Sequence, residues 1–476
     1  MTAPWELDAG ALALAYARRT LSPVEALRSV LARREAVDPH LNAVIALDPE
    51  TAEAAARASE RRWSRGEALS ALDGVPVSVK DNIPVAGQPC RWGSRLWTAH
   101  RQPHDELPVR RLRDAGALLF GKTNVPEFTL QGFTDNLLFG ATRNPWDLAR
   151  TPGGSSGGAV AAVAAGIGPA ALATDGGGSI RRPCAYTGLV GLKPSEGAVP
   201  RSGGLPEMLP GLEVIGPVAR CVADVVRILQ VIAPTMRFAD PASTVLAPPP
   251  CPLRIAHWPT IALGPVDPEI ARSVATVIGQ LRSMGHHVSE AEAPEAVDRF
   301  NRRAWPVLGA TGLAAVLRDR GAEATLEMTS ALATMLAAGR RLSAVDLFDA
   351  QVLRRALREA MDNVFETVDM VLTPACAAMP WAFDRSHPET IAGRAVDARG
   401  HAVFTAFVNG AGLPALALPG PPSPEGIPIG FQLVGRRGDD ARLCALGLDF
   451  ERRHGPAWHW PTAVSSLLPR SESSSA

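Results

Sequence analysis

The chain has 476 residues, of which 46% are hydrophobic and 20% are charged, and this composition is typical of a globular enzyme with a sizeable core. Its 48 basic and 48 acidic residues give a formal net charge of zero, so no electrostatic footprint for nucleic acid or an anionic membrane is expected. The six cysteines are far apart and form no CxxC pair, which argues against a zinc site or a disulfide scaffold and favours a reducing compartment.

The first 64 residues carry helical patterns and no targeting signal. Residues 1–6 have neither a positively charged start nor an apolar core, so we expect no signal peptide. No run of about 18 residues is free of charge and proline, so we expect no membrane span and a cytoplasmic protein. Residues 6–64 are predicted to be helical, and SPVE at residues 22–25 is a capping box with proline at the first helical position.

Strands and helices then alternate. Residues 75–80 alternate valine with Pro76 and Ser78, which predicts a strand that is at least half buried and that ends in a turn at residues 81–82. Residues 105–115 are predicted to form a helix that Gly116 closes, and residues 117–121 a buried strand.

Two glycine clusters around serine, GGSSGG and DGGGSIRRP, lie within residues 151–196. Glycine at this density costs chain entropy and adds no packing, so it belongs where the backbone turns sharply or presents its N–H groups. Between the clusters, residues 159–165 predict a short helix, and residues 170–174 a buried strand that places Asp175 at its end. Either cluster alone would more often be a simple turn. Together they make three serines candidates for chemistry: Ser155, Ser156 and Ser179.

The second half continues the alternation without internal repeats. Residues 235–252 are rich in proline and are predicted to be a surface excursion, and the tail 466–476 is predicted to be disordered. The predicted helices are 220–233, 267–284, 294–337, 343–367 and 438–453, and the predicted strands are 254–257, 369–373, 415–418 and 428–434. Alternating helices and buried strands indicate an α/β layered fold.

Two local motifs match known patterns but lack the required context. GALLFGKT at residues 116–123 matches GxxxxGK[ST], yet a helix precedes the first glycine and Pro126 interrupts any following helix, so we expect no phosphate loop. Residues 154–158 match GxSxG, but a loop with two prolines stands where the nucleophile elbow needs a strand. The downstream histidines show no catalytic context, and we interpret them as surface or core residues: His257, His286, His287, His387 and His401.

Lys80 closes the predicted strand at residues 75–80. A lysine at the end of a buried strand is costly unless it is paired or deprotonated, and desolvation lowers its pKa, so it could serve as a base near neutral pH. Taken alone, Lys80 would more simply reach the surface or pair with Asp81.

The whole set of segments resembles the amidase signature family. The resemblance rests on GVPVSVKDN, GALLFGKTNVPEF, RTPGGSSGGAVAAVAAG, ATDGGGSIRRP and GLVGLKPSEG, and continues in VDMVLTP and VNGAGLPALALPG. It implies a single large α/β domain over residues 1–465, with a mixed central sheet covered by helices on both faces. The core signature lies at 71–205, and the variable helices on the substrate side lie at about 290–367.

The family uses a Ser–cisSer–Lys triad, and its lysine, bridging serine and nucleophile fall on Lys80, Ser155 and Ser179. The resemblance implies an oxyanion hole built from backbone N–H groups. It also implies that neighbouring residues hold the two glycine clusters in place. The oxyanion donors are Gly176, Gly177, Gly178 and Ser179, and the supporting residues are Ser156, Asp175 and Arg181, the last two as a charge pair. Three positions depart from the usual pattern: Gly176, Arg182 and Ser195.

The leading hypothesis is hydrolysis of a small, apolar or aryl amide, with ester or carbamate as further substrates, by a monomer or homodimer that needs no cofactor and no metal. The alternative is the glutaminase subunit of a tRNA-dependent amidotransferase, which works with partners. Activity on glutamine that appears only with partners would decide for the alternative. A third hypothesis, ATP binding at residues 116–123, would require Lys122. The sequence suggests an apolar pocket formed by Phe133, Phe139, Met208 and Leu209.

Overall fold

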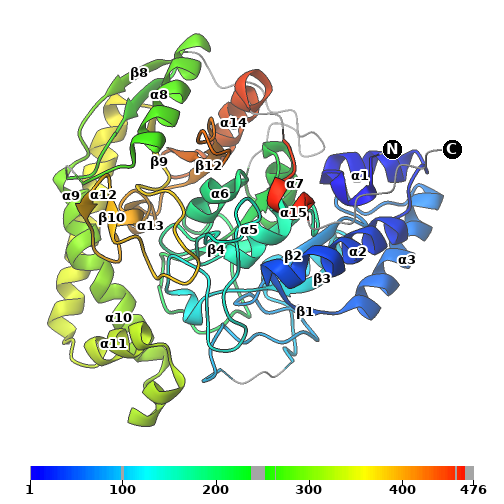
Figure 1. Ribbon diagram of the computed structural model, residues 1–476, viewed down its shortest axis with the longest axis horizontal. Helices are drawn as coiled ribbons and strands as arrows, with labels where there is room; N and C mark the ends of the chain where they lie inside the picture. Colours follow the sequence, from blue (N-terminus) through cyan, green and yellow to red (C-terminus); the bar gives the residue numbers. More distant parts are fainter. Residues whose placement is uncertain (1, 98–100, 237–251, 263, 456–457, 467–476) are drawn as a thin grey trace.

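The computed structural model describes residues 2–97, 101–236, 252–262, 264–455 and 458–466. Within these residues one mixed sheet of eleven strands runs through the molecule in the order β1-β3-β2-β4-β6-β5-β12-β13-β9-β7-β8 (Figure 1). The strands are β1 (Val44–Leu47), β2 (Pro76–Lys80), β3 (Leu118–Thr123), β4 (Ala170–Asp175), β5 (Val190–Lys193), β6 (Val214–Ala219), β7 (Arg254–His257), β8 (His287–Glu290), β9 (Met370–Pro374), β12 (Ala415–Pro419) and β13 (Gly430–Val434). A separate hairpin pairs β10 (Thr390–Ile391) with β11 (Arg394–Ala395).

Helices cover the sheet, and α10 and α11 form a projection at one end of the molecule (Figure 1). The helices are α1 (Ala9–Ala17), α2 (Pro23–Leu41), α3 (Pro49–Arg65), α4 (Leu107–Asp114), α5 (Gly157–Ala164), α6 (Arg181–Thr187), α7 (Val222–Ile232), α8 (Pro268–Ser283), α9 (Glu295–Arg299), α10 (Trp305–Val316), α11 (Ser330–Gly339), α12 (Ala344–Thr367), α13 (Ala406–Ala411), α14 (Asp440–His454) and α15 (Thr462–Ser465). The predicted α/β class, with one large mixed sheet flanked by helices, is therefore confirmed. None of the described helices has the length and apolar composition needed to cross a membrane.

Two helix predictions are wrong. Residues 6–64 are not all helical, because Asn42 takes a left-handed φ of 54° that ends α2. The Asp38 carboxylate then accepts the N–H groups of Ala43 and Val44 and leads the chain into β1. Residues 294–337 do not form one helix either, since a π-helical turn at Phe300–Ala304 joins α9 to α10, and Ala322–Glu327 forms only a 3₁₀ helix before α11.

Other predictions match within a few residues, including β2, β4, α7, and α12 with its capping box at Ser343. Strands β5, β6 and β8 have no counterpart among the predicted elements. Most of the predicted excursion at 235–252 and nearly all of the predicted tail lie outside the described residues.

The strand order of the sheet places the carboxyl ends of β2 and β4, which carry residues of the candidate site, next to each other. Strands β2 and β4 are parallel neighbours, with Val77 beside Ala170 and Val79 beside Leu172. Their carboxyl ends therefore meet at one edge, where Lys80 ends β2 and Asp175 ends β4. Helix α5 packs on these strands through small, fully buried residues. A Cβ at Gly158 would overlap the backbone nitrogen of Asn124, so this close contact requires glycine.

Candidate active site

The Lys80 side chain is fully buried and lies between the first glycine cluster and the end of β4. Its Nζ donates to Ser155 Oγ at 2.9 Å, to Thr174 Oγ1 at 2.8 Å and to the Thr174 carbonyl at 3.2 Å. Burial lowers the pKa of Lys80 to about 7, with Arg201 and Arg182 lowering it further and the carboxylates of Glu213 and Asp175 opposing the shift. The side chain therefore gains and loses a proton near neutral pH, beside a serine hydroxyl.

Ser155 stands where the loop 151–156 turns into α5, and the Gly154–Ser155 peptide bond is cis. The Ser156 hydroxyl donates to the Thr174 carbonyl at 3.2 Å, and the Ser156 N–H donates to the Ser179 carbonyl at 3.2 Å. These two bonds join the first glycine cluster to β4 and to the second cluster. Among the described residues no hydrogen bond links the Ser155 and Ser179 hydroxyls directly.

The turn that carries Ser179 is built around a buried ion pair. Arg181 contacts Asp175 through two nitrogens, each at 3.0 Å, and both side chains are fully buried. Burial alone would raise the pKa of Asp175, but the Arg181 charge, Lys193 and hydrogen bonds hold it well below its usual range. The remaining Arg181 donors reach distant segments through Gln432, the Thr405 carbonyl and Asn409. The predicted charge pair is present, and it anchors the turn.

The backbone of this turn presents fewer free N–H groups than the sequence predicts. The Gly178 N–H donates to Asp175 Oδ1 at 2.7 Å, because the carboxylate caps the turn from inside, so Gly178 is not available to an oxyanion. No hydrogen bond of the described residues uses the N–H groups of Gly176, Gly177 or Ser179, and these three residues line a cavity. Of the four predicted oxyanion donors, Gly178 is therefore already occupied, and Gly176, Gly177 and Ser179 remain candidates.

Two of the three residues that depart from the family pattern, Gly176 and Arg182, lie at the cavity beside Ser179. Gly176 leaves room that Leu209 fills, since an added Cβ would lie 3.0 Å from Leu209 Cδ1. Arg182 donates to the Gly177 carbonyl and, at 3.3 Å, to the Gly154 carbonyl, so it ties the two glycine clusters to each other. Ser195 donates to the Asp440 carboxylate at 2.5 Å, away from the cavity.

The cavity beside Ser179 has a volume of about 380 Å³. One wall consists of apolar side chains from α10 and α11, together with Leu209 from the loop before β6: Leu209, Trp305, Pro306, Ala310, Ala331, Met335 and Ala338. The charged lining residues are Arg182, Arg399 and Glu213, and His401 adds a polar ring. Ser179 is 7% exposed, so its hydroxyl is reached through this cavity.

Of the four predicted pocket residues, Leu209 lines this cavity. Phe133 instead packs beside Tyr186 and Trp381, and Phe139 lies under the Arg91 guanidinium. Met208 faces the cluster of Trp92 and Leu313. The prediction is wrong for Phe133, Phe139 and Met208, because none of them lines the cavity beside Ser179; Met208 lines a smaller neighbouring cavity instead.

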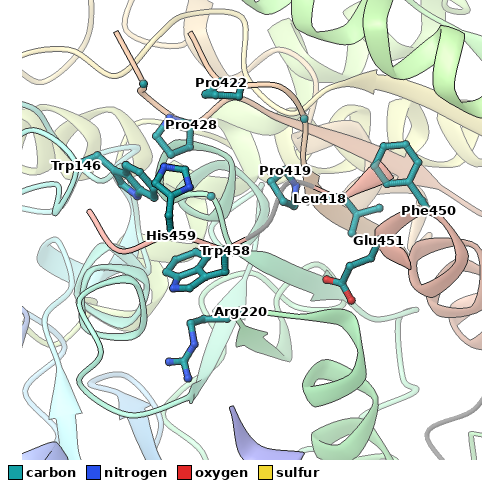
Figure 2. A pocket seen from close by; sticks show the side chains of 14 residues that line it. Trp146, Arg220, Leu418, Pro419, Pro422, Pro428, Phe450, Glu451, Trp458 and His459 are labelled. Carbon is teal, nitrogen blue, oxygen red and sulfur yellow. The ribbon is translucent and has the colours of Figure 1, made fainter. Parts of the chain in front are cut away.

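A second cavity of about 60 Å³ lies between β12, α14 and the segment 458–459 (Figure 2). Figure 2 shows Trp146, Trp458 and His459 grouped on one side and Glu451 beside Phe450 on the other. Glu451 accepts the Val222 N–H at 3.1 Å, and Arg220 donates to the Glu6 carbonyl at 3.2 Å, so both charged groups are held by the fold. Since no candidate catalytic residue lines this cavity, the space beside Ser179 is the candidate substrate site.

The rejected motifs have structural roles. Lys122 lies within β3, fully buried, and donates to the Ile83 carbonyl, so Leu118–Thr123 form a strand and not a phosphate loop. The GxSxG match follows a loop, as expected. In the part of the chain that the structure describes, no group of three or more His, Cys, Asp or Glu side chains could hold a metal ion.

Sequence reasoning missed four residues of the site. Thr174 accepts from Lys80, which also donates to Ser155, and Asn82 Nδ2 donates to Thr174 Oγ1 at 3.2 Å. Their positions, one residue before Asp175 and two after Lys80, were the available signal. Arg399 and His401 line the cavity from a segment that carries no motif.

Comparisons with known proteins extend over nearly the whole chain. The family model described as Amidase matches residues 25–444. One of the subunits of the glutamyl-tRNA(Gln) amidotransferase of Chloroflexus aggregans is 35% identical over 489 residues, which cover 95% of this chain and 97% of that protein. A solved structure described as an amidase is similar with a TM-score of 0.86 and 31% identity, covering 94% of this chain and 100% of that one. A bacterial aryl acylamidase of the amidase signature family gives a TM-score of 0.86 and 29% identity, covering 98% and 99%.

Proposed function

Because the chain belongs to the amidase signature family and is therefore an enzyme acting on amide C–N bonds, we propose that it forms an acyl-enzyme on Ser179. The observation that carries this proposal is the contact of 2.9 Å between the buried Lys80 amine and the Ser155 hydroxyl, next to the turn that holds Ser179. A serine hydroxyl is a weak nucleophile until a base removes its proton, and a lysine with a pKa of about 7 can be that base.

In the proposed mechanism the neutral Lys80 amine accepts a proton from Ser155, while Ser155 accepts one from Ser179. Ser179 attacks the amide carbon, and the developing oxyanion is held by the N–H groups of Gly176, Gly177 and Ser179. The relay then runs backwards and protonates the leaving amine. Water finally releases the acid from Ser179. Each preorganised donor of this kind contributes about 3 kcal/mol to stabilisation of the transition state.

The first candidate function is a free-standing amidase whose substrate has a small acyl part, with esters and carbamates as further substrates. The apolar wall formed by Leu209, Trp305 and Met335 supports this choice, because it would bury the carbon skeleton of the acyl group. The similarity to a bacterial aryl acylamidase gives it further support.

The second candidate is the glutaminase subunit of an amidotransferase complex, and the curated relatives favour it, since they are subunits of glutamyl-tRNA(Gln) amidotransferases. Glutamine carries an ammonium group that needs an acidic partner. The acid in the cavity lining, Glu213, is already paired with Arg201 at 3.0 Å, and this pairing argues for the first candidate.

A substrate panel distinguishes the two candidates. We expect the purified chain to hydrolyse at least some members of a set of aliphatic amides, anilides, carbamates and p-nitrophenyl esters without added protein, measured as released amine, ammonia or nitrophenol. Activity confined to glutamine, or appearing only when partner subunits are added, would contradict the first candidate and support the second.

The pH profile tests the lysine base. The deprotonated amine is the active form, so activity is lost as the pH falls through the Lys80 pKa of about 7. Between pH 6 and pH 8 the neutral fraction of such a group rises from about a tenth to about nine tenths, so we expect kcat/KM to rise about tenfold. A kcat/KM that stays constant down to pH 5 would contradict the proposed base.

Lys193 provides the control for this profile. Burial also lowers its pKa to about 7, but its Nζ donates to the carbonyls of Pro194 and Leu413 at 2.7 Å and not to a serine. The variant Lys193→Met should keep the midpoint of the wild-type profile, provided that its melting curve shows a folded protein.

A further inference from the structure

The cavity beside Ser179 contains a cationic side chain without an anionic partner. Arg399 lies with its guanidinium 5.2 Å from the centre of the Trp305 ring. None of the hydrogen bonds or ion pairs of the described residues uses this guanidinium. The nearby Asp397 carboxylate accepts the backbone N–H of Arg399 at 2.8 Å and forms no ion pair with the side chain. Burial and the charge of Arg182 lower the pKa of Arg399 to about 9.

His401 lines the same cavity two residues later. The ring is 3% exposed, and both of its nitrogens are buried without a hydrogen-bond partner in the described structure. It packs against Trp381, with ring centres 4.7 Å apart, and its Nε2 lies where a Cβ at Gly132 would collide with it. Burial and the charges of Arg182 and Arg399 hold the pKa of His401 well below its usual value, so the ring is neutral and offers one N–H donor.

Arg182 is the third side chain with an unused donor. Its terminal nitrogens are used by Gly177, Thr405 and Gly154, whereas its Nε is buried and unpaired in the described structure. Three side chains that line one cavity thus carry donors that no acceptor satisfies. The Arg182 Nε and the His401 nitrogens are buried, whereas Arg399 is partly exposed to the cavity. Leaving buried donors unsatisfied is costly, and active sites are where natural proteins tolerate that cost.

The balance of charge in the cavity is positive. Glu213 is the acid in its described lining, and it pairs with Arg201 at 3.0 Å and accepts from Asn82 at 3.4 Å. Arg182 and Arg399 therefore face the cavity without a carboxylate of their own. A ligand that brings a negative charge would satisfy both the charge and the unused donors.

We propose that the acyl part of the substrate carries a carboxylate, which Arg399 binds with help from His401 and the Nε of Arg182. This inference rests on the proposed function, because it concerns the substrate of the Ser179 site. The apolar wall at Trp305 and Met335 faces the carbon chain between the reacting amide and the carboxylate. The substrate class is the monoamide of a dicarboxylic acid or a compound with the same two end groups.

The test compares matched amides. The monoamides of malonic, succinic, glutaric and adipic acid are assayed for ammonia release, each against the simple amide in which a methyl group replaces the carboxylate. We expect the best monoamide to exceed its neutral counterpart in kcat/KM by about 10- to 100-fold, the size of one charge-assisted contact. Arg399→Ala should reduce this ratio by a similar factor, mainly through KM.

Two further variants keep the result interpretable. His401→Phe retains the ring on Trp381 but removes its nitrogens, and it should lower the same ratio. Arg385→Ala removes an exposed arginine of the same segment, which pairs with Glu389, and it should leave the ratio at the wild-type value. Glutarate should inhibit hydrolysis of a neutral amide competitively in the wild type, and more weakly in Arg399→Ala.

The outcomes separate this inference from the proposed function. Hydrolysis of neutral amides with no monoamide preferred, or equal ratios in Arg399→Ala and Arg385→Ala, overturns the carboxylate contact and leaves the amidase proposal standing. Failure to hydrolyse any amide overturns the proposed function itself. L-Glutamine is assayed beside glutaramate, which lacks only its amino group. A preference for glutamine that Arg399→Ala abolishes supports the carboxylate contact and moves the function to the second candidate.

Discussion

Replacing Ser179 with alanine is expected to abolish turnover and acyl-enzyme formation, with kcat/KM reduced by about 10⁵-fold or more. The reason is that Ser179 is the candidate nucleophile that lines the cavity together with the free N–H groups of Gly176 and Gly177. The turn itself should survive, because the Asp175–Arg181 pair that anchors it does not involve the Ser179 side chain. The measurements are steady-state kinetics on the best amide and the burst of nitrophenol from a p-nitrophenyl ester.

Two variants calibrate this result. Ser155→Ala should retain slow turnover, since it removes the proton relay but leaves the nucleophile and the oxyanion donors. Ser202→Ala removes the hydroxyl of an exposed serine and should behave like the wild type. A Ser179→Ala variant that keeps the wild-type rate would overturn the assignment of the nucleophile.

The second large loss of activity is expected for Lys80→Met. Loss of the base should lower kcat/KM by about 10³- to 10⁴-fold while KM changes little, because Lys80 contacts Ser155 and Thr174 and does not line the cavity. Methionine has a similar length and avoids the cost of burying an amine, so the fold should tolerate it. Lys80→Arg should be equally inactive, because a guanidinium keeps its proton.

Lys122 is the matched control for this experiment. It is fully buried on β3, beside Val79 of β2, and donates to the Ile83 carbonyl. Lys122→Met should lower the melting temperature through the lost hydrogen bond, yet leave kcat of the folded fraction near the wild-type value. Equal losses of kcat in the two variants would indicate that Lys80 is only structural.

Much of this site can be predicted from sequence because the residues that carry the chemistry lie in contiguous motifs. VKDN, GGSSGG and DGGGSIR point to Lys80, Ser155 and Ser179, and parallel pairing of β2 with β4 brings their segments together. The sequence does not show which acceptor each backbone N–H group binds. The motif makes Gly178 an oxyanion donor, yet its N–H is used by the Asp175 carboxylate.

The substrate pocket is far less predictable. Phe133 and Phe139 have the apolar character of pocket residues, but Phe133 packs against Tyr186 and Trp381 and Phe139 lies under the Arg91 guanidinium, contacts that the sequence does not reveal. Arg399 and His401 reach the cavity from a segment with no regular pattern, and only the tertiary structure places them beside Ser179. The long helix predicted at 294–337 is wrong because the apolar periodicity does not reveal the π-helical turn at Phe300–Ala304 or the 3₁₀ helix at Ala322–Glu327.

The Asp175–Arg181 pair also bears on when the turn that carries Ser179 can form during synthesis of the chain. Arg181 depends on acceptors from Thr405, Asn409 and Gln432, which the ribosome adds more than 200 residues later. A nascent chain that has not reached these residues lacks three acceptors of the Arg181 side chain, next to the turn that carries Ser179. We therefore expect the turn that carries Ser179 to reach its final form only after the last fifth of the polypeptide has been synthesised.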